Sequence, residues 1–173
     1  MKNMTLQDVV AGFNTTPFLF AGSGISRRYY GLPDWVGLLT YFAEKIKKDQ
    51  FAYRYYESKV TELETVEQLP TIASYIEKDF NEAWFQNLEE IRSESEQVKK
   101  AVAEGVSPFK AEIAEYINSL SVVNEEYLEE VGKLQNIAKN NISGVITTNY
   151  DCFFEDFFEG YKSFIGQDEL VFS

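Results

Sequence analysis

Two short apolar runs stand far apart in the chain, and each is followed at once by glycine or small polar residues. The first is Phe18–Ala21 and the second covers residues 142–148. Apolar runs of this length, bounded by turn-forming residues, are typical of buried β-strands. The pattern therefore predicts two buried strands.

Between these runs, apolar residues recur at every third or fourth position, which predicts an all-helical middle segment. Asp34 is placed to cap the first of its helices, and Ser107 with Pro108 to begin a later one. The apolar stripes run, in chain order, from Trp35 to Ile46, Val66 to Phe80, Trp84 to Val102 (ended by Gly105), Phe109 to Leu120 and Tyr127 to Ile137.

Shorter elements are expected near both ends. Thr5 is placed to cap a short helix that carries Leu6 and Phe13, and an aromatic helix is expected over residues 153–158. Residues 162–165 and 169–172 are strand candidates. Because the last of these reaches almost to the final residue, we expect an incomplete sheet. The chain is then either a fragment of a longer protein or a natural short form, and the sheet favours the fragment.

Length and charge bound the class of protein. The chain has 173 residues and a net charge of −12, which predicts a single domain (1–173) and argues against a surface that binds nucleic acid or anionic membranes. The helical insertion covers about residues 36–140. No apolar segment approaches the ~20 residues that span a membrane, and the N-terminus lacks a signal-peptide core. We expect a cytoplasmic protein.

The chain has one cysteine, Cys152, and no histidine. One cysteine cannot form a disulfide within the chain or a cysteine-rich zinc site. The lack of histidine excludes a Ser-His-Asp triad and the usual histidine ligands of metals. We expect no metal cofactor.

The residues after the first strand are the first candidate site. Gly22, Ser23 and Gly24 lead into a helix start at Ile25 and Ser26. In nucleotide-binding folds, a strand that passes through glycines into a helix brings backbone amides close to a phosphate. An ordinary tight turn has the same sequence pattern, so this stretch alone leaves both interpretations open.

The residues after the second strand are the other candidate site. If the strands are parallel, residues 147–151 lie at the same sheet edge as residues 22–26, which is where open α/β sheets bind ligands. Asn149 can donate and accept, and so could orient a ribose hydroxyl, an amide or a water. Asp151 could cap the following helix or accept from a ligand amide.

Three motifs stand in order along the chain: Gly22-Ser23-Gly24-Ile25-Ser26, Gly31-Leu32-Pro33-Asp34-Trp35 and Thr147-Thr148-Asn149-Tyr150-Asp151. Taken together, they resemble the signatures of the sirtuin family. Sirtuins carry Gly-Ala-Gly-x-Ser, Gly-Ile-Pro-Asp-Phe-Arg and Thr-Gln-Asn-Ile-Asp. The third motif of this chain is more similar to the sirtuin-like domains of bacterial anti-phage defence proteins, many of which hydrolyse NAD.

The resemblance implies an α/β fold, with a Rossmann-like parallel sheet and a large all-helical segment between its first two strands. NAD, as substrate, would lie across the strand ends. Asn149 would be the catalytic residue, holding the nicotinamide ribose and a water while the glycosidic bond breaks through an oxocarbenium-like state. The implied cofactor-binding residues are Gly22, Ser23, Gly24 and Ser26 along the diphosphate, Pro33, Asp34 and Trp35 on a covering loop, and Thr148, Asn149 and Asp151.

The chain departs from the sirtuin pattern at several points. Ser23 replaces an alanine, and Val36 replaces an arginine whose charge role could pass to Arg27 or Arg28. The first two motifs are one residue further apart than usual. The zinc-binding cysteines and the catalytic histidine, which follows the third motif in sirtuins, are missing from these residues.

We therefore expect an NAD glycohydrolase domain from bacterial defence that forms ADP-ribose and nicotinamide, and that is inactive as this chain alone. The alternatives are an NAD-dependent protein deacylase and a non-catalytic module for NAD or ADP-ribose binding or for assembly. Expected partners are NAD or ADP-ribose, a C-terminal sensor domain or a separate defence subunit, and further copies of the chain.

Overall fold

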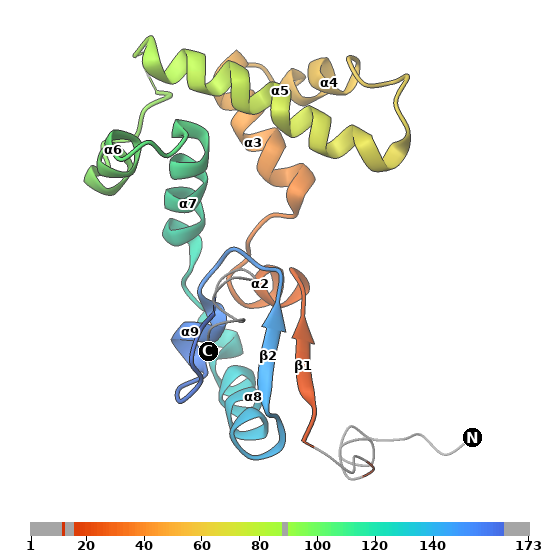
Figure 1. Cartoon of the computed structure of the whole chain (residues 1–173), viewed down its shortest axis with the longest axis vertical. Helices are drawn as coiled ribbons and strands as arrows, with labels where there is room; N and C mark the ends of the chain where they lie inside the picture. The colour runs from red at the N-terminus through yellow and green to blue at the C-terminus, as the bar shows by residue number, and fades with distance from the viewer. Residues whose placement is uncertain (1–11, 13–15, 88–89, 165–173) are drawn as a thin grey trace. The chain divides into compact units, whose positions relative to one another are not determined.

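The computed structural model describes residues 12, 16–87 and 90–164 of the chain. They form two compact units (Figure 1). The first unit holds the described residues up to Gly31 and from Ser121 onward, and the second holds residues 32–120. The helix expected near Thr5 and the strand expected over residues 169–172 lie outside the described residues.

The first unit contains a parallel sheet that confirms the predicted α/β character. Strand β1 (Phe18–Ala21) pairs with β2 (Gly144–Thr147), and Ala21 lies opposite Thr147. Two parallel strands make up the sheet in the part of the chain that the structure describes. Both strands therefore end at the same edge (Figure 1).

Only one face of this sheet is covered within the described residues. Phe18, Phe20 and Ile146 are 63%, 70% and 51% exposed, so the prediction of two buried strands is wrong for this face. The Phe18 ring lies across the sheet over Gly144, where an added Cβ would come within 2.8 Å of the ring. A side chain larger than glycine at this position would therefore have to displace the exposed Phe18 ring.

Aromatic packing holds the helices of the first unit together. Tyr29 stacks on Phe153 with ring centroids 5.3 Å apart, and Tyr30 meets the same ring edge-on. Phe153 is fully buried. The helical elements are α2 (Gly24–Tyr29), the 3₁₀ turn η1 (Glu125–Tyr127), α8 (Leu128–Asn141) and α9 (Phe153–Phe157).

The strand predicted over residues 162–165 is wrong for its described part, because residues 161–164 are irregular. The Tyr161 hydroxyl hydrogen-bonds to the carbonyl oxygens of Ala138 and Ile142, at 3.0 and 3.1 Å. These bonds hold the segment at the end of α8. Helix α8 falls within the expected helical insertion by sequence, yet it belongs to the first unit.

The second unit is helical, as predicted. Asp34 caps α3 by accepting a hydrogen bond from the amide of Gly37 at 2.9 Å. Helix α3 packs against α4 and α5, and α7 packs against α5 and α6. The helices are α3 (Trp35–Lys47), α4 (Ala52–Glu57), α5 (Thr65–Phe85), α6 (Glu96–Ala103) and α7 (Pro108–Leu120).

The single apolar stripe predicted from Trp84 to Val102 is wrong, because it starts at the end of α5 and runs into α6, which are separate helices. Asn87 and Glu90 have φ angles of 54° and 70°, in the left-handed region that ends a helix. Ser95 then caps α6 by accepting from the amide of Val98. Val66, placed in another predicted stripe, is 84% exposed.

A polar cluster in the second unit leads to a prediction about pH. Asp79 accepts hydrogen bonds from the Tyr56 hydroxyl (2.9 Å) and from Lys47 Nζ (3.2 Å). Burial raises the pKa of Asp79, but these bonds and the nearby lysine charges outweigh burial, so the pKa lies below its ordinary value. The carboxylate therefore stabilises the fold above its unfolded-state pKa, and this contribution is lost as pH falls through the folded-state pKa.

We expect Asp79→Asn to flatten the fall in unfolding free energy below about pH 5, measured by urea unfolding at a series of pH values. Glu62→Gln, at an exposed carboxylate of the same unit, is the control and should leave the profile unchanged. An unchanged profile in Asp79→Asn would contradict the prediction.

Candidate functional site

Two loops leave the sheet at the same edge of the first unit. The glycine loop (residues 22–26) follows β1, and the asparagine loop (residues 147–151) begins with the last residue of β2. The parallel register predicted this juxtaposition, and hydrogen bonds between the loops confirm it.

Asn149 joins the two loops through its side-chain amide. Its Nδ2 donates to the carbonyl oxygen of Gly22 at 3.1 Å and to Ser26 Oγ at 2.8 Å. Since a carbonyl oxygen only accepts, the atom facing Gly22 must be the amide nitrogen. None of the hydrogen bonds found among the described residues uses Asn149 Oδ1, so this oxygen can accept from a ligand.

Ser26 and Asp151 make a second link between the loops. The Ser26 hydroxyl is buried and donates to Asp151 Oδ2 at 2.5 Å, the length of a charge-assisted bond. Asp151 Oδ1 accepts from the amide of Phe153, the first residue of α9, at 3.1 Å, although the N-cap position itself is occupied by Cys152. The only hydroxyl hydrogen of Ser26 is thus used in a hydrogen bond within the protein. Its contact with a diphosphate stays a prediction.

The glycines of the first loop are not required by the protein itself. Gly22 and Gly24 do not have the positive φ that favours glycine, whereas Gly31 has a φ of 69°. A Cβ built on Gly22 or Gly24 would meet no atom within 4 Å. Both residues are exposed, so the backbone there is open to close approach from outside.

The remaining predicted contacts fall in different places. Thr148 is exposed in the asparagine loop, and Ser23 in the glycine loop. Pro33, Asp34 and Trp35 belong to the second unit, where Asp34 caps α3 and Trp35 is its first residue. Their contact with a cofactor stays a prediction.

Glu130, in α8, takes part in a side-chain network of the first unit. Arg28 Nη2 donates to Glu130 Oε2 at 2.7 Å, and the Tyr29 hydroxyl donates to Oε1 at 3.0 Å. The hydrogen bond from Arg28 is the main reason that the pKa of Glu130 lies below its ordinary value. Arg28, one of the two residues considered as a replacement for the sirtuin arginine, is hydrogen-bonded to Glu130 in this network. No sequence signal links residues so far apart.

Cys152, beside Asp151, lacks the lowered thiol pKa of a nucleophilic cysteine. Partial burial, and then the charges of Glu155 and Asp156, raise the pKa of its thiol. A raised pKa keeps the thiol protonated at neutral pH, and the thiolate is the reactive form.

In the described residues, no group of three or more acidic or cysteine side chains is arranged to hold a metal ion. No helix there combines the length and the apolar character needed to cross a bilayer.

Comparisons with known proteins add no relative: no family model, no curated protein and no solved structure matches the chain. The residues of the two loops therefore carry the inference about function.

Proposed function

We propose that the glycine and asparagine loops bind NAD, as in the sirtuin-like domains of bacterial anti-phage defence proteins, on a sheet of Rossmann-like topology. One observation carries the proposal. Gly22 and Gly24 stand at a strand end where neither their φ angles nor packing among the described residues calls for glycine. Close approach of a ligand to the backbone is a physical reason for glycine at such positions.

We further propose that the reaction served by this site is hydrolysis of NAD to ADP-ribose and nicotinamide. Two hydrogen bonds from Nδ2 hold the Asn149 side chain in place. Its Oδ1 therefore has a defined position from which to accept a hydrogen bond from a ribose hydroxyl or a water. Positioning of this kind lowers the barrier to an oxocarbenium-like transition state. The chain has no histidine to act as a base, and we expect slow turnover or none from the chain alone.

The binding proposal is tested by calorimetric titration of the folded chain with NAD and with ADP-ribose. Gly24→Ala should bind at least tenfold more weakly, because its methyl group occupies the space open to the ligand. Gly24 is the first residue of α2, so the same substitution should raise the unfolding free energy, by up to ~1 kcal/mol. Loss of binding without loss of stability separates a ligand role from a structural one.

Gly132→Ala is the matched control. Gly132 lies in α8, and a Cβ there also meets nothing within 4 Å. This variant should gain stability and keep its affinity for NAD. A folded chain that releases no heat with either ligand, or a Gly24→Ala variant that binds as tightly as the parent, would contradict the proposal.

The hydrolytic step needs a separate measurement, namely release of nicotinamide from NAD by this chain and by any longer protein found to contain it. Asn149→Ala should abolish turnover. Because this substitution also removes both hydrogen bonds that join the loops, NAD affinity must be measured on the same variant. Turnover that survives in Asn149→Ala would exclude the assigned role.

One observation favours the non-catalytic alternative, a module that only binds NAD or ADP-ribose. The polar groups of Ser26 and Asp151, and the amide nitrogen of Asn149, are bonded to one another or to the backbone. NAD binding without nicotinamide release, in this chain and in any longer protein found to contain it, would decide for this alternative.

A further inference from the structure

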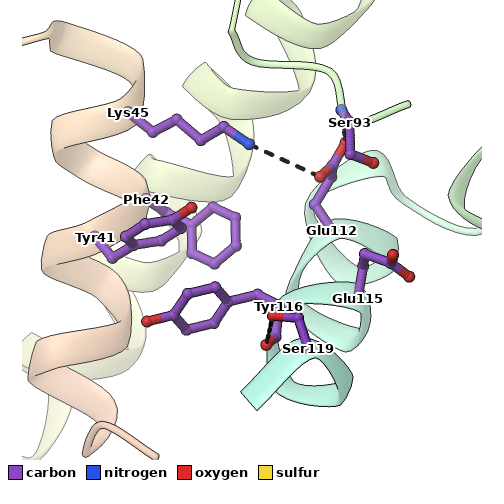
Figure 2. Close-up of a pocket in the computed structure, with 8 residues that line it drawn as sticks. All are labelled: Tyr41, Phe42, Lys45, Ser93, Glu112, Glu115, Tyr116 and Ser119. Atoms are coloured by element: carbon purple, nitrogen blue, oxygen red, sulfur yellow. Dashed lines mark hydrogen bonds and ion pairs between the residues drawn. The ribbon is translucent and has the colours of Figure 1, made fainter. Parts of the chain in front are cut away.

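A pocket of about 160 Å³ opens in the helical second unit, between α3, α7 and the segment that precedes α6 (Figure 2). It lies outside the loops discussed above, and no role has been assigned to it. The close-up shows a charged pair and a group of aromatic rings among the side chains that line it.

The charged pair consists of Glu112 and Lys45. Glu112 is 3% exposed, and its Oε1 accepts from the indole nitrogen of Trp84 (3.1 Å) and from the amide of Ser93 (2.7 Å). Its Oε2 lies 3.8 Å from Lys45 Nζ, which is longer than a hydrogen bond. The carboxylate is thus anchored through one oxygen, while the other oxygen and the ammonium are close but not hydrogen-bonded to each other.

Ser93 supplies a second polar group that lacks a partner. Among the described residues, its Oγ is buried and makes no hydrogen bond. Buried hydroxyls almost always have a hydrogen-bond partner, and binding of a water or ligand is one explanation of an exception. Two residues that line the pocket, Ser93 and Glu112, therefore each keep unused hydrogen-bonding capacity, at Oγ and at Oε2.

Aromatic rings form another part of the lining. The rings of Tyr41 and Tyr116 stack with centroids 4.4 Å apart, and Phe42 meets both edge-on. Figure 2 shows these rings to one side of the Lys45–Glu112 pair. A flat apolar group fits such a wall, and a cavity of about 150 Å³ is known to admit benzene.

We propose that this pocket binds a small aromatic carboxamide. The ligand carbonyl oxygen accepts a hydrogen bond from Lys45 Nζ, and the ligand amide nitrogen donates one to Glu112 Oε2. The Ser93 hydroxyl donates a further hydrogen bond to the ligand carbonyl oxygen. The ring lies against the tyrosines. A carboxylate ligand would suit Lys45 but repel Glu112, and an ammonium ligand would do the reverse. A neutral group that carries a donor beside an acceptor satisfies both. This proposal is independent of the NAD site.

The test uses benzamide as the probe and the Trp84 indole N–H as the reporter, followed by NMR on the full chain. Trp84 Nε1 is bonded to Glu112, so a ligand at Oε2 should shift its signal saturably. The chain's other tryptophan is Trp35, and Trp35→Phe identifies the two signals. Benzoate and benzylamine should bind at least tenfold more weakly than benzamide.

Two variants test the contacts. Lys45→Met removes the donor but keeps the length of the side chain, and Ser93→Ala removes the unpaired hydroxyl. Each should weaken benzamide binding at least tenfold while circular dichroism shows a folded chain. Lys110→Met, at an exposed position of the same helix as Glu112, should bind as the parent does.

Three results would overturn the proposal: a Trp84 signal that does not respond to benzamide, equal binding of the charged probes, or full binding by both variants. The first would mean that water alone fills the pocket.

Discussion

Glu112→Ala is expected to lower the unfolding free energy of the second unit by about 3–5 kcal/mol. The substitution leaves the indole nitrogen of Trp84 and the amide of Ser93 without their acceptor, and Lys45 without its counter-ion. The penalty is large because Glu112 is 3% exposed, so water cannot easily replace the lost carboxylate.

Urea unfolding followed by tryptophan fluorescence measures this effect in the right place, because both tryptophans, Trp35 and Trp84, belong to the second unit. Glu112→Gln keeps one acceptor oxygen and should cost less, about 1–2 kcal/mol. Glu115→Ala, a half-buried position one turn further along α7, should change stability by less than about 0.5 kcal/mol. A loss below about 1 kcal/mol in Glu112→Ala would show that the buried carboxylate is not a structural anchor.

The first unit has its own weak point at Asp151. We expect Asp151→Ala to cost about 2–4 kcal/mol, because it removes a charge-assisted bond to buried Ser26 and the cap on the amide of Phe153. Asp151→Asn retains an acceptor for the cap and should cost less. Amide hydrogen exchange in β1 and β2 is the suitable measurement, since the tryptophans do not report on this unit.

A double-mutant cycle with Ser26→Ala separates the two contributions. If the Ser26–Asp151 bond is as close in solution as in the structure, the two substitutions should be non-additive by about 1–2 kcal/mol. Glu159→Ala, at an exposed acid of the same unit, should have almost no effect. Additive effects of Ser26→Ala and Asp151→Ala would contradict the assigned link.

Local signals in the sequence predicted several element boundaries correctly. The strand Phe18–Ala21, the cap at Asp34 and the helix start at Pro108 are all as expected. Each depends on a few adjacent residues, namely an apolar run, a capping carboxylate and a proline whose missing N–H is harmless in a first turn.

Burial was harder to predict, because it depends on what packs against an element. Strand β1 is apolar throughout, as buried strands are, yet its Phe18 and Phe20 lie on a sheet face that is exposed within the described residues. The break between α5 and α6 was missed for a different reason. Asn87 and Glu90 adopt left-handed φ angles that apolar periodicity does not signal.

At the candidate site, too, the sequence predicted where the two loops lie but not which hydrogen bonds join them. Turn-forming residues after two apolar runs were enough to place Gly22 and Asn149 at one sheet edge, given parallel strands. The partners of their polar groups come from loops more than a hundred residues apart in the chain. The bonds from Asn149 to Gly22 and from Ser26 to Asp151 were therefore visible only after folding.

By itself, the sequence determined the helical middle segment, two strands and the candidate loops after each strand, because periodicity, caps and glycines act over a few residues. Tertiary structure alone decided that Asn149 is held by its amide nitrogen and that Ser26 is buried against Asp151. It also showed that Gly22 and Gly24 border open space. The sequence alone left open whether the glycine loop is a tight turn or a ligand site. The structure shows that neither φ nor packing requires glycine at Gly22 or Gly24, and packing is a property of the folded chain.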